Sequence, residues 1–192
     1  MATLNVLVID ELDTDRVLET CLRQQGYEVA TLKLQKLNLG EVIAHLRPDV
    51  VILNLYSPND TVLKMIRTIN QQHSLPVVMF AEDQQTGTIN EVIRAGVSAY
   101  IVDGLEPRRI KTIVEVAIAR FKEQQHLLDE LKKAKTQLED RKYIDRAKAL
   151  LIQSKGYSED EAYHALRKLA MDRKVSLGDM ARNVIAMAEW LK

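Results

Sequence analysis

The sequence predicts an α/β fold, a doubly wound parallel sheet of five strands, followed by a coiled-coil helix and a small three-helix module. Three features give this prediction. Short apolar runs alternate with amphipathic stretches over the first 105 residues, the alternation stops near Arg108, and two shorter helical patterns follow Gly156. We therefore divide the chain into residues 1–107, 108–138 and 139–192.

The first part contains the strands and the helices between them. Amphipathic spacing and capping residues predict helices that alternate with the strands, and Pro107 favours the first turn of a last helix. Such alternation produces a parallel sheet whose functional edge lies at the carboxyl ends of the strands. The strands are predicted at 5–9, 27–32, 49–54, 76–80 and 99–102, and the helices at 15–25, 38–46, 61–72 and 86–95.

A single long helix is predicted after Arg108, because neither glycine nor proline occurs again before Gly156. About 50 helical residues would span about 75 Å, more than the width of one domain. One face has the three-four spacing of a coiled-coil seam, which favours a parallel homodimer over a helix packed on its own domain. The seam comprises Val114, Ala117, Phe121, Gln124, Leu128, Leu131, Lys135 and Leu138, with polar Gln124 and Lys135 able to fix its register.

Two shorter helices are predicted beyond Gly156. Ser158 and Glu161 have the spacing of a capping box, which predicts a helix over 159–173. Ser176 then caps a helix over about 177–191. Apolar residues recur at helical spacing in both, so they form a three-helix module with the end of the long helix.

Composition excludes several classes of protein. With 46% hydrophobic, 28% charged and 5% aromatic residues, the chain is globular and not disordered. Its one cysteine, Cys21, lies on an apolar helical stripe, so we expect a packed thiol and neither a disulfide nor a zinc site. The amino terminus lacks a signal peptide and no apolar run approaches about 18 residues, so we expect a cytoplasmic protein without membrane contact.

Charge is distributed unevenly. Residues 1–107 hold 8 Lys and Arg against 14 Asp and Glu, a net charge of −6, whereas residues 108–192 hold 19 against 13, a net charge of +6. A basic tail fits a polyanionic partner, although the two halves could also attract each other.

Polar residues end several of the predicted strands. Asp10 and Glu11 end the first strand, Asn54 ends the third, and Asp103 follows the fifth, so these side chains should converge at one edge. Carboxylates there would hold magnesium, and a further aspartate could accept a phosphoryl group.

Residues 4 to about 120 combine the acidic pair Asp10 and Glu11 with Ser57-Pro58 and with Tyr100 in the fifth predicted strand. With these features they resemble the receiver domain of bacterial response regulators. The resemblance implies a phosphorylated aspartate, but Asn54 stands in its place, Ala81 replaces a Ser or Thr, and Asp103 replaces a Lys. An amide is a poor nucleophile and Asp103 would repel a phosphoryl dianion. We therefore expect a pseudo-receiver that recognises a protein, with no enzymatic activity and no cofactor.

The tail carries a set of spaced motifs at residues 138–141, 144–152, 156–163, 166–171 and 177–181. With these motifs, about residues 132–190 resemble the ANTAR module, a three-helix RNA-binding domain of transcription antiterminators. The resemblance implies binding to leader mRNA with paired hexaloop hairpins, which prevents a terminator from forming. The whole chain resembles the nitrate- and nitrite-assimilation antiterminators, which implies control by a nitrate-sensing partner protein and not by a kinase. The tail departs mildly from the ANTAR pattern at Ala149 and Ile152.

Basic and aromatic side chains of this tail are the candidate RNA contacts, since cations bind phosphates and flat groups stack on loop bases. We rank Lys148 first for direct contact, and expect Trp190 to be a packing anchor. Tyr163 could also pack on the module's core, and Arg173 and Lys174 could also stabilise a helix end. The candidates are Arg141, Lys148, Lys155, Tyr163, Arg167, Lys168, Arg173 and Lys174.

Two other functions stay open at this point. One is a phosphorylation-driven or DNA-binding response regulator, which the substitutions at Asn54, Ala81 and Asp103 and the lack of a helix-turn-helix disfavour. The other is a protein-interaction scaffold in which the basic half docks on the acidic half.

Overall fold

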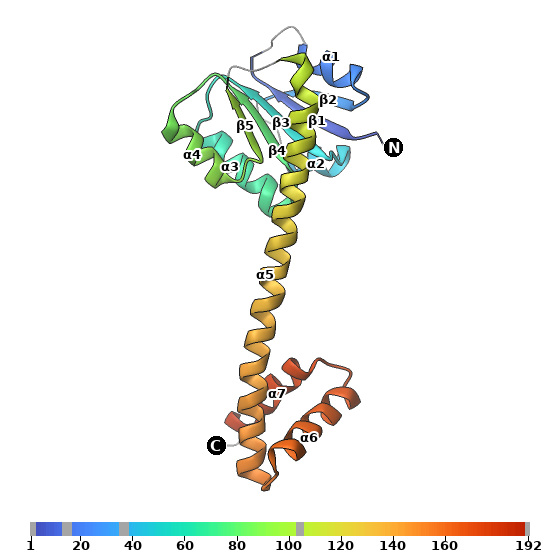
Figure 1. Ribbon diagram of the computed structural model, residues 1–192, viewed down its shortest axis with the longest axis vertical. Coiled ribbons are helices and arrows are strands. Elements are labelled where there is room, and N and C mark those ends of the chain that lie inside the picture. The colour runs from blue at the N-terminus through green and yellow to red at the C-terminus, as the bar shows by residue number, and fades with distance from the viewer. Residues whose placement is uncertain (1–2, 13–16, 35–38, 103–105, 191–192) are drawn as a thin grey trace. The chain divides into compact units, whose positions relative to one another are not determined.

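The computed structural model divides into two compact units, Met1–Gln125 and His126–Lys192, with one helix contributing to both (Figure 1). No helix among the described residues is long and apolar enough to cross a membrane. The structure describes residues 3–12, 17–34, 39–102 and 106–190.

A five-stranded, all-parallel sheet forms the centre of the first unit, in the order β2-β1-β3-β4-β5. The central strand β3 is buried along its whole length, as expected for a parallel sheet covered on both faces. The predicted fold class is confirmed. The strands are β1 Asn5–Asp10, β2 Glu28–Lys33, β3 Val50–Leu55, β4 Val77–Ala81 and β5 Ala99–Val102.

Helices cover the two faces of this sheet (Figure 1). On one face, α1 and the start of α5 pack on alternate strand residues such as Val8 and Ile52. On the other, α2, α3 and α4 pack on the intervening residues such as Ile9 and Leu53. The helices are α1 Val17–Gln24, α2 Leu39–Leu46, α3 Asp60–Thr68, the π-helical turn η1 Ile69–His73, α4 Thr86–Ala95 and α5 Pro107–Lys155.

The helix predicted over 61–72 differs from the structure at both ends. It begins at Asp60 because the Asn59 side chain accepts a hydrogen bond from the Val62 amide at 3.0 Å, an N-cap. Its last turn widens into η1, from which Asn70 Nδ2 donates to the carbonyls of Ala95 and Gly96. This side chain ties η1 to the end of α4.

The first part of the predicted coiled-coil seam on α5 is wrong, because its residues are buried within one chain. Val114 and Ala117 are fully buried in the first unit's own core, and Phe121 is only 8% exposed. They therefore lack the exposed surface that a seam between two chains needs. The apolar stripe that remains exposed begins at Leu127 and Leu128 and continues through Leu131 and Leu138.

Three helices make up the second unit: the end of α5, α6 Glu159–Asp172 and α7 Leu177–Trp190. The predicted capping box is present, with Ser158 and Glu161 exchanging hydrogen bonds. Trp190 corrects another expectation, because it is 93% exposed and packs on no core. The second unit's core consists of Ala147, Leu166, Ala170, Met180, Ala181 and Ile185.

Candidate functional site

The carboxyl edge of the sheet brings Asp10 and Asn54 together, as their positions at the strand ends predict. The two residues are register partners on neighbouring parallel strands, and Asn54 Nδ2 donates to Asp10 Oδ1 at 3.0 Å. The same Asp10 oxygen accepts from the Leu12 amide at 3.0 Å. Asn54 is 1% exposed, so its amide belongs to a packed polar contact.

This arrangement offers little for phosphoryl transfer. The buried amide at position 54 carries no charge, and the neighbouring Ala81 side chain has no hydroxyl to donate. Within the described ranges no group of three or more His, Cys, Asp or Glu side chains could hold a metal ion. Glu11 is exposed, while Asp103, the fourth predicted member of the edge, lies outside the described residues.

A second polar cluster centres on Asp83, which the sequence analysis did not identify. Its carboxylate accepts from Ser57 Oγ at 2.8 Å, from the Gln85 amide at 2.9 Å and from Thr88 Oγ1 at 3.1 Å. The Tyr100 hydroxyl donates to the Asp83 carbonyl at 2.7 Å. One residue thereby joins the segments after β3 and β4 to α4 and β5.

Hydrogen bonds to the Asp83 carboxylate favour its charged form. The Gln85 amide, followed by the Ser57 hydroxyl, lowers the pKa of Asp83 below its ordinary 3.8. Desolvation, with a smaller contribution from the Asp83 charge, raises the pKa of Tyr100. Asp83 therefore stays an acceptor-only anion at neutral pH. Sequence reasoning missed it because it follows β4 in a loop, with no periodic pattern to single it out.

In the second unit, Lys148 is held by the protein itself. Its ammonium contacts Glu159 Oε1 at 2.9 Å and Asp145 Oδ1 at 3.0 Å, and its side chain is only 16% exposed. The hydrogen bond to Glu159, then that to Asp145, raises the pKa of Lys148 above 10.5. The residue that the sequence analysis ranked first for RNA contact thus forms a link between α5 and α6.

The other candidate cations are exposed and make no ion pair among the described residues. Tyr163 is 38% exposed, with its ring edge-on to His164 at 6.0 Å between centroids. Lys174 has a left-handed φ of 54° just after α6, and the Arg173 amide bonds to Leu169, so their backbones end the helix while their charges face solvent. The exposed cations are Arg141, Lys155, Arg167, Lys168, Arg173 and Lys174.

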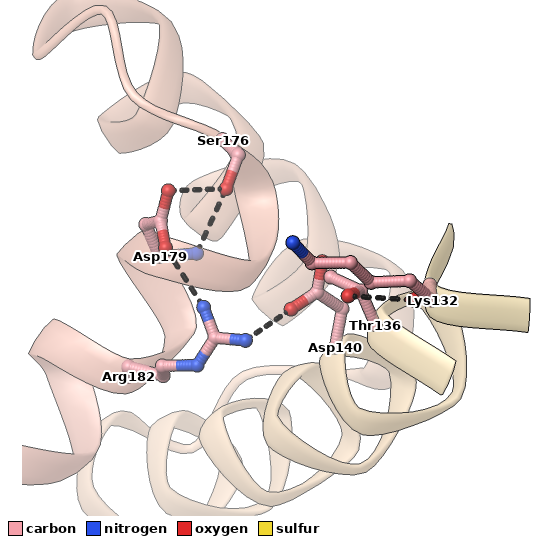
Figure 2. A network of polar contacts seen from close by, with 6 residues as sticks. All are labelled: Lys132, Thr136, Asp140, Ser176, Asp179 and Arg182. Carbon is pink, nitrogen blue, oxygen red and sulfur yellow. Dashed lines mark hydrogen bonds and ion pairs between the residues drawn. The ribbon is translucent and has the colours of Figure 1, made fainter. Parts of the chain in front are cut away.

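Arg182 joins α7 to α5 in a network that sequence reasoning also missed (Figure 2). Its guanidinium contacts Asp140 on α5 and, at 2.7 Å, Asp179 on α7. The carbon of the guanidinium also lies 4.9 Å from the centre of the Tyr143 ring, a cation–π contact. Ser176 completes the network, because its hydroxyl lies 2.7 Å from Asp179 and accepts from the Asp179 amide at 3.0 Å.

Gly178 allows this network to form. A Cβ at this buried position would overlap the Asp140 carboxyl group, which Arg182 holds in place. The segment Leu177-Gly178-Asp179 therefore needs its glycine for a close approach between helices. The sequence alone marks this glycine only as part of a motif.

Comparison with known families gives two matches. The response regulator receiver domain matches residues 6–115, and the ANTAR domain matches residues 132–185. Both families are regulatory and non-enzymatic. The two matches together cover the strands of the sheet and most of α5, α6 and α7.

Two curated relatives match the chain to different extents. The transcriptional regulatory protein PdtaR of Mycobacterium tuberculosis is 27% identical over 168 residues, which cover 88% of this chain and 82% of PdtaR. The nitrate regulatory protein of Klebsiella oxytoca is 33% identical over 85 residues, 44% of this chain and 22% of that protein.

Solved structures resemble the first unit in particular. The chemotaxis response regulator CheY4 of Vibrio cholerae is 22% identical with a TM-score of 0.51, over 60% of this chain and 99% of that one. NtrX from Brucella abortus is 26% identical with a TM-score of 0.55, over 67% of this chain and 29% of that one. The first likeness concerns the fold alone.

Proposed function

Because the chain belongs to the response regulator receiver family and carries a C-terminal ANTAR domain, we propose that it is a transcription antitermination regulator that binds hairpin-loop leader RNA. The ANTAR module is the RNA-binding part in this proposal. The pseudo-receiver responds to a partner protein and not to phosphorylation.

The exposed cations of the second unit are the observation that carries the RNA proposal. Six predicted contacts, Arg141, Lys155, Arg167, Lys168, Arg173 and Lys174, are exposed and without ion pairs in the described part of the chain. Unpaired Lys and Arg side chains are available to phosphates without first breaking an internal contact. Tyr163 and the guanidinium of Arg167 lie one turn apart on α6 and offer flat groups to unstacked loop bases.

The sheet edge supports control by a partner protein over control by phosphorylation. Asn54 is buried and donates to Asp10, so the position that would accept a phosphoryl group is occupied by a neutral, hydrogen-bonded amide. The relative from Klebsiella oxytoca is a nitrate regulatory protein, which supports a partner of the nitrate- or nitrite-sensing type.

A homodimer through α5 is the third part of the proposal. Leu128, Leu131 and Leu138 are 50%, 66% and 59% exposed and follow the three-four spacing of a coiled-coil seam. A second copy of the same helix would bury them. The seam proposed here begins after Phe121, since the residues before it belong to the first unit's core.

Fluorescence anisotropy with a two-hairpin hexaloop RNA tests the RNA proposal. We expect selective binding over a loop-scrambled RNA and over duplex DNA, with an affinity that falls as salt rises. Arg167→Ala and Lys168→Ala should each weaken binding, whereas Arg120→Ala, an exposed cation of the first unit, should not. Equal binding to all three nucleic acids would reduce the tail to a generic basic surface, and no binding would favour a protein-interaction scaffold.

A further inference from the structure

Lys148 occupies the middle of a basic stripe on α5. Arg141 and Lys155 precede and follow it by seven residues, or about 10 Å along the helix, so the three side chains lie on nearly the same face. Arg141 and Lys155 make no ion pair in the described part of the chain, whereas Lys148 makes two. The stripe is therefore interrupted at its centre by an internal ionic contact.

Carboxylates crowd this point. The first turn of α6 carries Glu159, Asp160 and Glu161, and Asp145 precedes Lys148 by one turn of α5. Glu161 bonds to the backbone and hydroxyl of Ser158, so its role is to cap the helix. Glu159 has a 75% exposed side chain and Asp145 a 58% exposed one, and the Lys148 ammonium contacts both.

These two carboxylates lie where they would disfavour RNA. A charge is felt over about 8 Å at physiological ionic strength, a distance comparable with the spacing of the stripe. A phosphate bound between Arg141 and Lys155 would therefore be repelled by Asp145 and Glu159 if their charges were uncompensated. The Lys148 ammonium lies within 3.0 Å of both carboxylates.

We propose that Lys148 is a positioning residue of the RNA interface and not a phosphate contact: it holds Asp145 and Glu159 and compensates their charge, which leaves the flanking cations free to bind. This inference rests on the proposed RNA-binding function. It assigns the direct phosphate contacts to the exposed cations on either side.

A double-mutant cycle, measured with the 192-residue chain and the two-hairpin RNA, tests the proposed role of Lys148. Lys148→Met in the native background should weaken binding about tenfold, which is about 1.4 kcal/mol. In the background Asp145→Asn with Glu159→Gln, the same Lys148→Met change should alter the affinity less than twofold, because the two negative charges that Lys148 compensates are absent. Lys148→Arg should keep most of the native affinity.

The salt dependence of binding separates the two roles. In the background Asp145→Asn with Glu159→Gln, loss of a phosphate contact would lower the slope of log K against log salt by about 0.7 to 0.9, whereas loss of a residue that acts only on these two carboxylates would leave the slope unchanged. The inference would be overturned if Lys148→Met reduced RNA affinity as much in the neutral background as in the native one and also lowered the slope of log K against log salt. The neutral background keeps the cycle readable even if Lys148→Met alone lowers helix content.

Arg146→Gln is the matched control. Arg146 forms an exposed ion pair with Glu189 at 2.8 Å that also links α5 to another helix. Its loss should leave affinity within about twofold, so an equal loss from Arg146→Gln would indicate general loosening and contradict a specific role for Lys148. If the unmodified chain does not select the hairpin RNA, both the proposed function and this inference are wrong. If it does select the hairpin RNA, but Lys148→Met weakens binding equally in the native and the neutral backgrounds, only the inference is wrong.

Discussion

Asn54 donates a 3.0 Å hydrogen bond to Asp10 at the point where two neighbouring parallel strands end. The contact has a clear chemical direction, since an amide donates and a carboxylate accepts. It explains how the sheet edge tolerates an acidic residue next to a fully buried position.

Asn54→Asp should destabilise the first unit by about 2 kcal/mol at neutral pH, because two carboxylates would face each other at hydrogen-bonding distance. Repulsion raises the pKa of one of them in the folded state, so the lost stability should return as the pH falls below that raised pKa. Urea unfolding at several pH values measures this effect. A deficit that grows as the pH falls would contradict the proposed repulsion.

The same variant tests the phosphorylation chemistry. Asn54→Asp should form no stable phospho-adduct with acetyl phosphate and magnesium, because Ala81 supplies no hydroxyl. Intact mass spectrometry detects the adduct directly. A robust adduct would show that the remaining residues of the edge suffice for phosphoryl transfer.

Asp83→Ala should lower the melting temperature of the first unit at pH 7, because Ser57, Thr88 and the Gln85 amide lose their shared acceptor. The folded-state pKa of Asp83 is depressed, so its contribution is present above the ordinary value of 3.8 and is lost as the pH falls through the lower folded pKa. The melting difference should therefore shrink below about pH 4. Exposed Glu82→Ala is the control, and an equal loss from it would refute a special role for Asp83.

Much of the fold follows from the sequence, and the failures have physical causes. The strand at 99–102 and the helix at 86–95 match the structure residue for residue, because alternation and a glycine terminator define them locally. Val114 was misassigned because a core-facing stripe and a coiled-coil seam have the same three-four spacing. Which of the two a residue joins depends on the sheet packed against it, and no local pattern carries that information.

In the candidate site, too, some contacts could be predicted from the sequence and others could not. The meeting of Asp10 and Asn54 was predictable, because parallel strands of known order end at one edge. The engagement of Lys148 by Glu159 was not, because it depends on how α6 turns back along α5 after Gly156. Charge and motif identify cations, while pairing in the folded chain decides which of them remain available.

Gly178→Ala should destabilise the second unit by about 1–3 kcal/mol, because the new methyl group would displace the Asp140 carboxyl group from Arg182. Gly87 provides the matched control, since a Cβ at this helical position meets nothing within 4 Å. Gly87→Ala should be neutral or slightly stabilising, as alanine is the better helix former. Thermal unfolding followed by circular dichroism compares the two, and equal effects would remove the argument from close approach.

Leu131→Lys should convert a dimer into a monomer at micromolar concentration. Leu131 is 66% exposed within one chain, so its burial in a seam with its symmetry mate would contribute about 3 kcal/mol for the pair, or roughly 150-fold in Kd. Sedimentation equilibrium measures the change directly. Met187→Lys, which places the same charge at a 57% exposed apolar residue of α7, should leave the mass unchanged. Dissociation by Met187→Lys and not by Leu131→Lys would move the interface from α5 to α7.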